Sequence, residues 1–309
     1  QEDNEVYIFT KDYLKKDVIT KMHVYKDDKK IKELTIRSNI EDKFIMSASS
    51  SKLSDGSYLI SGTYGNSSRR ASSVGIYVLK FTNDKEVFFK FINYLDIKNF
   101  TSYLSEKRQE KIEKKKKKKE KKGDELELNY LMAPHKIIED NGEYVLLGEA
   151  FYPTYRTECT TTTTSSGTTT SCRQVFDGYQ YTHYFTASFD KSGNLTWSNS
   201  APMFISEKPF FVKRYISANY KNSELSVIYA SWDKIYSAAY KKGVEIRKSS
   251  VELAKSHNED DKVKYSVGNN TIHWYGNYYI SYGYQKIKNK EAEDKRRKVY
   301  FLNKIEFIP

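Results

Sequence analysis

SYLISGTY, residues 57–64, returns as EYVLLGEA at residues 143–150, and this repeat is the clearest sign of architecture in the chain. Each copy follows a tight turn, at residues 54–56 and 140–142, and each has its glycine at the sixth position. Short runs rich in Tyr, Val, Ile, Leu and Thr, bounded by Gly, Asn and Asp, predict β-strands. A glycine inside a strand fits a bulge or the close approach of another backbone. We therefore expect a repeated antiparallel unit.

Four strand-like segments belong to each copy of the repeat. The first set covers residues 45–53, 58–64, 75–81 and 86–92, and the second covers residues 131–139, 144–152, 181–190 and 195–200. A third set runs from Phe211 through 225–230 and 234–240 to 244–249, and a shorter one from Asn270 through 278–284 to 299–307. Three more strands are expected near residues 6–10, 18–25 and 31–37. Four-stranded units that return about every 50 residues are typical of β-propeller blades.

The sequence therefore predicts an all-β fold, in which residues 1–309 form a single β-propeller domain of about five blades. Each blade is a four-stranded antiparallel sheet, and blades stack because one blade alone cannot bury both faces. The three strands at each end leave two possibilities. Either the termini complete one blade together, or the chain is a piece of a larger ring. A β-sandwich, or a pair of them, also uses short strands and tight turns, but the visible repeat favours the propeller.

Residues 96–123 interrupt the strands with a segment of helical character. Ile97, Phe100 and Leu104 recur near helical spacing. Glu110 precedes Lys114 by four residues, an order that stabilises a helix. We expect the first two turns of this helical insertion to pack on the body and its charged half to extend into solvent. A glycine at position 123 is suited to the C-cap.

Most of the positive charge of the chain lies in this insertion. Residues 107–122 contribute +8 to a net charge of +12, so the rest of the chain is nearly balanced. The candidates for binding phosphate groups of nucleic acid, lipopolysaccharide or a lipid surface are Lys114, Lys115, Lys116, Lys117, Lys118 and Lys119. The alternative, which we favour, is a helix kept soluble by its charge. Nucleic acid is further disfavoured because no recognition module accompanies the run.

The two cysteines, Cys159 and Cys172, bracket a run of Thr, Ser and Gly without an apolar residue. We interpret residues 157–176 as a Thr- and Ser-rich loop closed by a disulfide, with two free thiols as the alternative. Closing this loop would contribute on the order of 3 kcal/mol by limiting the entropy of the unfolded chain. A disulfide would place the protein in an oxidising compartment.

The start of the chain and its hydropathy bear on location. The first residue is Gln, and no basic segment with an apolar stretch precedes the first strand, so the chain looks like a mature or trimmed product. No apolar run approaches the ~20 residues that a transmembrane helix needs. We expect no transmembrane helix.

Four stretches resemble a known family. They are DGSYLISGTY at residues 55–64, NYLMAPH at 129–135, GEAFYPTYR at 148–156 and FDGYQYTH at 176–183. Together they resemble a family of exported β-propeller-like proteins from Bacteroidota, notably flavobacteria, over roughly residues 50–235. The resemblance implies an exported protein in the periplasm, at the outer membrane or on the cell surface. It implies no activity, because the stretches are specific to the family rather than to a chemistry.

Motifs of the common enzyme classes are sparse. The histidines show no HExxH motif, no close pair and no Cys/His cluster of zinc spacing. No GxSxG elbow, P-loop or GxGxxG motif after a strand occurs either. We therefore expect no metal and no cofactor. Glu149 and Asp177 are candidates for an acid or base in a glycan cleft, but a hydrogen-bonded structural carboxylate is the more common role.

Aromatic residues with a few charged partners gather around the second unit. The candidate ligand-binding residues are Glu149, Tyr152, Tyr155, Arg156, Tyr179, Tyr181, His183 and His135. They lie near predicted strand ends, so we expect them to converge on a groove for a sugar or a peptide. The alternative is that the tyrosines fill the interfaces between blades. For His135 the alternatives are a place on the central channel or a buried, hydrogen-bonded one.

Two functions of different classes remain. We favour a non-enzymatic binding or scaffold protein, exported or at the cell envelope, whose propeller loops and basic helix bind a protein partner or a glycan. The alternative is a hydrolase active on glycans or peptides. That alternative predicts two carboxylates about 5–9.5 Å apart over the central channel.

Overall fold

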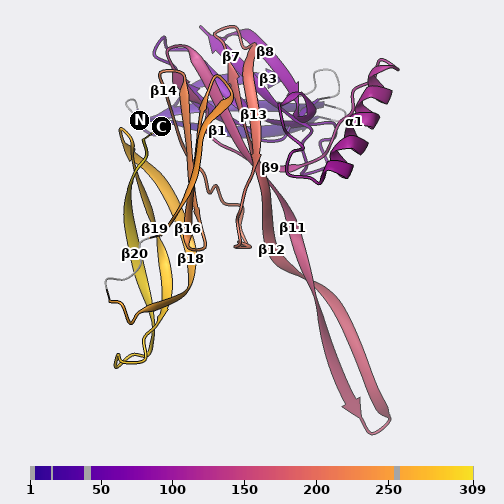
Figure 1. The fold of residues 1–309 in the computed structure, drawn as a ribbon. Coiled ribbons are helices and arrows are strands. Elements are labelled where there is room, and N and C mark those ends of the chain that lie inside the picture. The colour runs from indigo at the N-terminus through magenta and orange to yellow at the C-terminus, as the bar shows by residue number, and fades with distance from the viewer. Residues whose placement is uncertain (1–3, 15–16, 38–42, 254–257, 309) are drawn as a thin grey trace.

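A computed structural model of the chain describes residues 4–14, 17–37, 43–253 and 258–308. Within these residues the fold is all-β, with five antiparallel sheets, one α-helix and one short 3-10 helix. In the same residues no helix combines the length and the apolar character needed to cross a membrane. Figure 1 shows the sheets gathered together, with a two-stranded ribbon that extends far beyond them.

The strands are arranged in chain order. Sheet 1 contains β1 (Glu5–Leu14), β2 (Asp17–Lys26) and β3 (Lys29–Arg37). Sheet 2 contains β4 (Phe44–Ile45), β5 (Ser49–Lys52), β6 (Tyr58–Gly65), β7 (Gly75–Thr82) and β8 (Lys85–Asn93). Sheet 3 contains β9 (Leu131–Pro134), β10 (Ile138–Asp140), β11 (Glu143–Thr164), β12 (Gly167–Phe189) and β13 (Leu195–Pro202).

In the last two sheets each strand pairs with the next strand of the chain. Sheet 4 contains β14 (Ser217–Lys221), β15 (Glu224–Ser231), β16 (Lys234–Lys241) and β17 (Val244–Glu252). Sheet 5 contains β18 (Lys262–Tyr275), β19 (Tyr278–Lys288) and β20 (Arg296–Glu306). The prediction of successive antiparallel units is confirmed. The first strand of the third unit, however, is β14, and the segment that begins at Phe211 has no strand before Ser217.

Two segments that were predicted as single strands are each broken in two. β4 and β5 both pair with β6, and β9 and β10 both pair with β11. At the first break, the Thr63 carbonyl accepts hydrogen bonds from the N–H groups of Met46 and Ser47, at 2.8 and 3.4 Å. Two residues then face one, which is the pattern of a bulge. At the second break, Pro134 cannot donate to a ladder.

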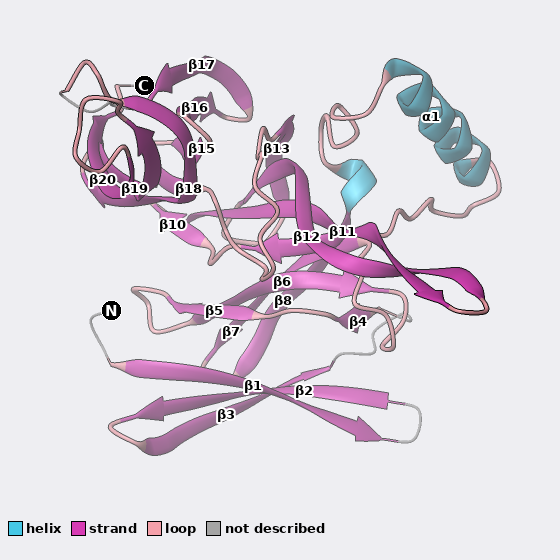
Figure 2. Ribbon diagram, turned by 90° about the horizontal axis from the view of Figure 1, so that it is seen from below, coloured by secondary structure: helices cyan, strands magenta, loops and turns pink. Residues whose placement is uncertain are grey.

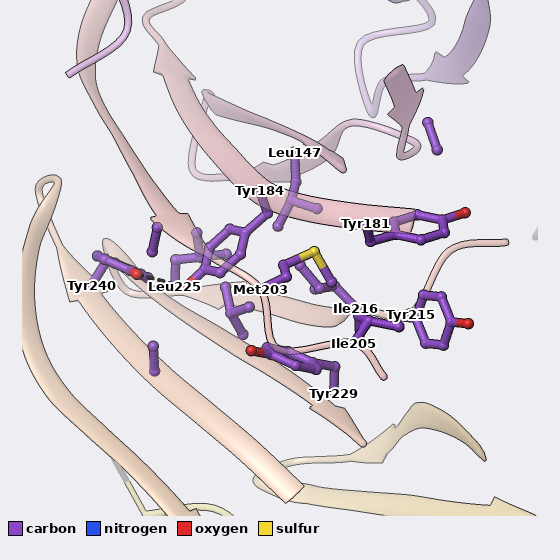
Figure 3. Packing of buried hydrophobic residues seen from close by; sticks show 14 of the residues in the cluster. Leu147, Tyr181, Tyr184, Met203, Ile205, Tyr215, Ile216, Leu225, Tyr229 and Tyr240 are labelled. Carbon is purple, nitrogen blue, oxygen red and sulfur yellow. Dashed lines mark hydrogen bonds between the residues drawn. The ribbon is translucent and has the colours of Figure 1, made fainter. Parts of the chain in front are cut away.

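Each sheet shares a hydrophobic core with the next sheet in chain order. The four cores centre on Met22 and Ile60, on Leu59 and Phe185, on Leu147 and Tyr229, and on Ile228 and Tyr279. Leu59 and Ile60 are neighbours in β6 but enter different cores, because successive side chains of a strand point to opposite faces. The central sheets are therefore apolar on both faces. Tyrosines occupy these cores, as Figure 3 shows for the one between sheets 3 and 4.

The two glycines of the repeat allow close packing. A Cβ atom at Gly62 would overlap the carbonyl oxygen of Ser47, and one at Gly148 would overlap the ring of Phe185. The shared glycine position thus reflects a close approach at the second strand of each unit, as the repeat predicts.

Gly62→Ala is expected to reduce the free energy of unfolding by about 3 kcal/mol, because the obstacle is backbone and cannot move aside by a change of rotamer. Chemical denaturation measures the effect. The matched control is Ser61→Ala in the same strand, whose buried hydroxyl has no hydrogen-bond partner within the described residues. An equal loss in both variants would contradict the steric explanation.

The helical insertion is placed differently from the prediction. The α-helix α1 (Glu106–Glu120) has no buried residue, and it contacts the body through Lys116, whose Nζ donates to the Leu95 carbonyl at 2.9 Å and pairs with Asp96 at 3.1 Å. Ile97 and Phe100 are buried, but they lie in the turns between the 3-10 helix (Tyr94–Asp96) and α1. The ion pair between Glu110 and Lys114 is present at 3.8 Å. The C-cap is Lys121 rather than Gly123, which lies two residues further on with a φ of +75°. The many charged side chains of α1 favour solvent. The buried residues Ile97 and Phe100 attach the segment that precedes the helix to the body.

The segment 157–176 is not a loop, which corrects the prediction. It is the distal part of the β11–β12 hairpin, whose strands pair without interruption from Tyr155↔Phe176 to Thr164↔Gly167. Cys159 and Cys172 are cross-strand partners and form the disulfide, so free thiols are excluded. We call residues 155–176 the arm. Figure 1 shows it leaving the body, and Figure 2 shows from below that its two strands project to one side of the sheets.

Replacing both arm cysteines by serine is expected to loosen the arm and to leave the body almost unchanged. An isolated two-stranded hairpin is marginal in water, and the arm is exposed along its length. The free energy of unfolding of the body should therefore fall by much less than the ~3 kcal/mol that a disulfide contributes when it closes a loop within a cooperative unit. Thermal unfolding measures this change. Limited proteolysis should cut the arm at least tenfold faster. Unchanged cleavage would show that the ladder alone holds it.

Candidate functional site

The sequence-predicted site residues do not converge on one groove. The structure distributes them over three places. Glu149, His135 and Tyr181 lie in a buried contact between sheet 3 and residues 213–216. His183 lies on the other side of β12, against residues 100–130. Tyr152, Tyr155, Arg156 and Tyr179 lie at the start of the arm.

Glu149 is a structural clamp between sheet 3 and the segment that leads into sheet 4. Its side chain is completely buried, and Oε1 accepts hydrogen bonds from His135 Nε2 at 2.7 Å and from the Ile216 N–H at 2.9 Å. Oε2 accepts from the Tyr215 N–H at 3.0 Å. Both oxygens of this carboxylate are engaged by protein donors, and none of its surface is exposed to a ligand. The arrangement favours a structural role over acid-base catalysis.

Residues beside Glu149 complete this contact. The Tyr181 hydroxyl donates to the Lys213 carbonyl and accepts from the Lys213 N–H, the latter at 2.8 Å. The Lys213 ammonium is half-buried, donates to the Asn269 carbonyl and lies 4.4 Å from the centre of the Tyr215 ring. Burial lowers the pKa of Lys213 below its ordinary value. His135 is thus a hydrogen-bonded residue, which is one of the two expected outcomes.

His183 lies in an aromatic cage. Its ring stacks on Tyr103 with centroids 4.1 Å apart, and the rings of Phe100 and Tyr130 meet it edge-on at 4.7 and 5.5 Å. Nδ1 is 2.9 Å from Thr182 Oγ1, and Nε2 is buried with no partner among the described residues. Burial lowers the pKa of His183 to about 3, so the ring is neutral near pH 7. The cage anchors the segment that precedes α1.

An exposed aromatic cluster occupies the base of the arm. Phe176 makes edge-on contacts with Tyr155 at 6.0 Å, Tyr179 at 5.0 Å and Phe210 at 5.9 Å. We call these four residues, with the adjacent Phe211, the collar. Tyr155, Phe210 and Phe211 have exposed fractions of 60, 61 and 83%. Large apolar rings that stay in water at this level, next to one another, mark an interaction surface.

The connection from sheet 3 to sheet 4 holds the collar against the arm. The Tyr179 N–H donates to the Pro209 carbonyl at 2.9 Å, and Lys208 Nζ contacts Asp177 Oδ2 at 2.8 Å. Gly178 has a φ of +96°, and a Cβ there would overlap the Lys208 carbonyl. This local fit explains how residues 203–216, which form no strand, are placed beside β12.

Ion pairs border the collar on its arm side. Arg156 contacts Glu158 at 2.6 Å and Asp177 at 3.7 Å, and Arg173 contacts Glu158 at 3.4 Å. The hydrogen bond from Lys208 lowers the pKa of Asp177, and the one from Arg156 lowers the pKa of Glu158. Asp177 is therefore an ionised partner in a salt-bridge chain. The sequence does not reveal this pairing of Arg156 with Asp177.

The distal arm is polar on both faces. Thr161 and Thr163 hydrogen-bond across the hairpin to Thr170 and Thr168, at 3.1 and 3.2 Å. Thr residues favour strands because they are β-branched, but this run has no apolar alternation that would reveal a hairpin. Sequence reasoning also missed Phe210 and Phe211 as site residues. The signal was present as the apolar run 210–212 directly after Pro209.

Metal binding finds no support in the described residues. No group of three or more His, Cys, Asp or Glu side chains there is arranged to hold an ion. The features that stand out at this place are on the surface: the arm, the collar and the ion pairs beside them.

Comparisons with known proteins assign no family. No family model and no curated protein matches the chain. Among solved structures, it is similar to a Bacteroides ovatus protein provisionally described as a hydrolase, with 10% identity, a TM-score of 0.28, and coverage of 84% of this chain and 68% of that one. It is also similar to a GH43_1 enzyme from Xanthomonas citri, with 8% identity, a TM-score of 0.21, and coverage of 78% and 84%. Similarities this distant carry no functional argument.

Proposed function

We propose that this chain is a non-enzymatic binding protein, exported to the cell envelope, that recognises a protein partner through the collar and the arm. The exposed collar is the observation that carries the proposal. Phe210 and Phe211 have no hydrogen-bonding groups, and they lie among exposed tyrosines beside Arg156. Aromatic residues and Arg are enriched in the centres of protein interfaces, surrounded by polar groups. A glycan groove would call for more polar groups among the rings.

Export is supported by the arm disulfide. Disulfides persist in secreted and periplasmic proteins and are rare where thiols are kept reduced. Cys159 and Cys172 lie on an exposed hairpin, where a reducing cytosol would readily reach them. The periplasm, the outer membrane and the cell surface are all oxidising, and the proposal includes any of the three.

We infer that the five sheets are blades of a propeller. Each sheet covers the next through its own core, which is how blades stack around an axis. In this arrangement the arm is an extension of two blade strands. The basic helix α1 is a second appendage, with all six lysines from Lys114 to Lys119 outside any core, and it suits contact with an anionic envelope surface.

The hydrolase alternative has little support from these side chains. Glu149 is buried with both oxygens hydrogen-bonded, and Asp177 is paired with Lys208 and Arg156. Neither carboxylate is placed beside an open cleft as an acid or a nucleophile. The binding function therefore remains the better explanation of the exposed rings.

Site-specific photo-crosslinking tests the binding proposal. A photoreactive residue at position 211 in the full chain should give a discrete protein adduct in intact cells, whereas the same residue at position 204 should not. Phe204 is the matched control because it is also an exposed Phe of the connecting segment, but it stacks on Tyr236 away from the collar. Phe210→Ala with Phe211→Ala should weaken binding of the captured partner about 30-fold. Equal adducts at both positions, or a glycan adduct, would refute the proposal.

A further inference from the structure

Sheet 5 has one face that no other part of the described chain covers. Its inner face packs on sheet 4 through Tyr279 and Phe301. Along β20 the side chains alternate, and the outward residues Tyr300 and Leu302 have exposed fractions of 56 and 61%. Both views place sheet 5 at the edge of the molecule, on the side away from α1 (Figures 1 and 2). The outward face is therefore separate from the basic helix.

A row of aromatic rings crosses this face. Tyr284 and Tyr300 are cross-strand partners with centroids 5.4 Å apart, and Tyr282 lies 6.3 Å from Tyr300. At the far end, Tyr275 contacts Trp274 at 4.6 Å and Tyr278 at 5.0 Å. These rings are Tyr and Trp, which combine an apolar face with an O–H or N–H donor. In this they differ from the Phe-rich collar.

Lysine ammonium groups lie over these rings. Lys298 Nζ is 4.3 Å from the centre of the Tyr284 ring, and Lys304 Nζ is 4.0 Å from that of Tyr278. Such cation–π contacts hold a charge at the surface without neutralising it. The face is therefore aromatic and positively charged at the same time.

A hollow of about 250 Å³ lies at one end of the row. It is lined by Lys264, Tyr265, Lys286, Ile287, Lys288 and Arg296. Lys288 and Arg296 are cross-strand neighbours, and Lys286 lies 5.6 Å from the Tyr265 ring centre. In the described chain none of these four cations has a carboxylate within ion-pair distance. Positive groups gathered without a counter-charge form a site for an anion.

We propose that the outward face of sheet 5 binds an acidic polysaccharide. An anionic group of the chain occupies the hollow between Lys264, Lys286, Lys288 and Arg296. Neighbouring sugar rings lie on Tyr284 and Tyr300, where the C–H faces of a pyranose meet the ring faces and the hydroxyl groups exchange hydrogen bonds. The rings and the hollow follow one another along β19 and β20, from Tyr278 through Tyr284 to Lys288, which suits an extended polymer.

The chemistry of the face separates this ligand from others. A neutral glycan would leave the four cations of the hollow without a counter-charge, so the charge of the face favours an anionic ligand. Single-stranded nucleic acid also uses stacked aromatic rings and cations. The arm disulfide points to an oxidising compartment, where acidic glycans are the more accessible polyanion.

Calorimetric titration of the full chain with tetragalacturonate, at about 150 mM salt, tests the proposal. We expect saturable binding, at least tenfold weaker binding of a neutral tetrasaccharide, and no tighter binding of a six-nucleotide oligo(dT). Lys288→Ala with Arg296→Ala, and separately Tyr284→Ala with Tyr300→Ala, should each weaken binding at least tenfold. Near-UV circular dichroism of each variant shows whether it retains the native packing.

Two controls make the result specific to sheet 5. Lys115→Ala with Lys118→Ala removes the same charge from α1 and should change the affinity less than twofold. Phe210→Ala with Phe211→Ala should leave it unchanged, so failure of this site is distinguishable from failure of the collar. An equal loss in the α1 variant, tighter binding of oligo(dT), or no binding of tetragalacturonate would overturn the proposal.

Discussion

Replacing Glu149 by alanine is expected to lower the free energy of unfolding by about 4 kcal/mol. The carboxylate is fully buried and accepts hydrogen bonds from His135, Tyr215 and Ile216. Alanine would leave two backbone N–H groups and an imidazole nitrogen without an acceptor, and each unsatisfied buried group costs about 1–3 kcal/mol. Urea denaturation, followed by circular dichroism, measures the loss. The reason for its size is that one side chain of sheet 3 satisfies three donors, two of them in the segment that leads into sheet 4.

Glu149→Gln separates hydrogen bonding from shape. Glutamine retains one acceptor oxygen but presents an NH₂ group to one of the donors, so we expect an intermediate loss of roughly 2 kcal/mol. The matched control is Glu158→Ala, an exposed carboxylate of the arm that is also paired with arginines, and its effect should stay within about 0.5 kcal/mol. If Glu149→Ala cost no more than Glu158→Ala, the clamp would have no energetic role.

Acidification below pH 6.5 is expected to destabilise the fold through His183. Burial lowers the pKa of His183 to about 3 in the folded protein, whereas the unfolded chain takes up the proton near pH 6.5. Below pH 6.5 the unfolded state binds more protons, so stability is complete above that pH and is lost as the pH falls toward 3. The loss reaches roughly 4 kcal/mol. Denaturation curves at half-unit pH steps give the slope.

His183→Phe isolates this contribution. Phenylalanine fits an aromatic cage made by Phe100, Tyr103 and Tyr130 and has no titrating group. Carboxylates with lowered pKa values, such as Asp55 and Asp190, add their own acid loss in both proteins. The difference between wild type and variant should therefore grow between pH 6.5 and 4.5. Parallel curves over that range would show that His183 is not held neutral by the fold.

The sequence predicted most strands because alternating apolar residues and turn residues, which are visible in the sequence itself, determine where these strands begin and end. Alternation and turn residues placed the three N-terminal strands, the two repeat units and most of sheets 4 and 5. The broken strands β4/β5 and β9/β10 escaped prediction because the cause is a long-range approach, in the first case between Ser47 and Gly62. The arm escaped it because a Thr run that is polar on both faces looks the same as a loop.

The sequence proposed some of the residues that lie at the base of the arm, but not Phe210 and Phe211, and not how the candidate residues are grouped. Tyr155, Arg156 and Tyr179 do lie together, but Glu149 and His183 point into different contacts on either side of sheet 3. The position of a residue in a strand determines only that its side chain and those of the adjacent residues point to opposite faces of the sheet. Which face meets sheet 4, and which meets the segment before α1, depends on how the sheets stack.

By itself the sequence determined an all-β chain of successive antiparallel units and a basic helical insertion, because strand alternation, turn chemistry and charge are local properties. The pairing of the two cysteines was decided by the structure, which makes them cross-strand partners. Only the tertiary structure decided which rings remain in water. Phe210 and Phe211 at the collar, and Tyr284 and Tyr300 on sheet 5, are the same residue types as the phenylalanines and tyrosines buried in the cores. They differ because no neighbouring sheet covers them, and burial is a property of packing rather than of the residue.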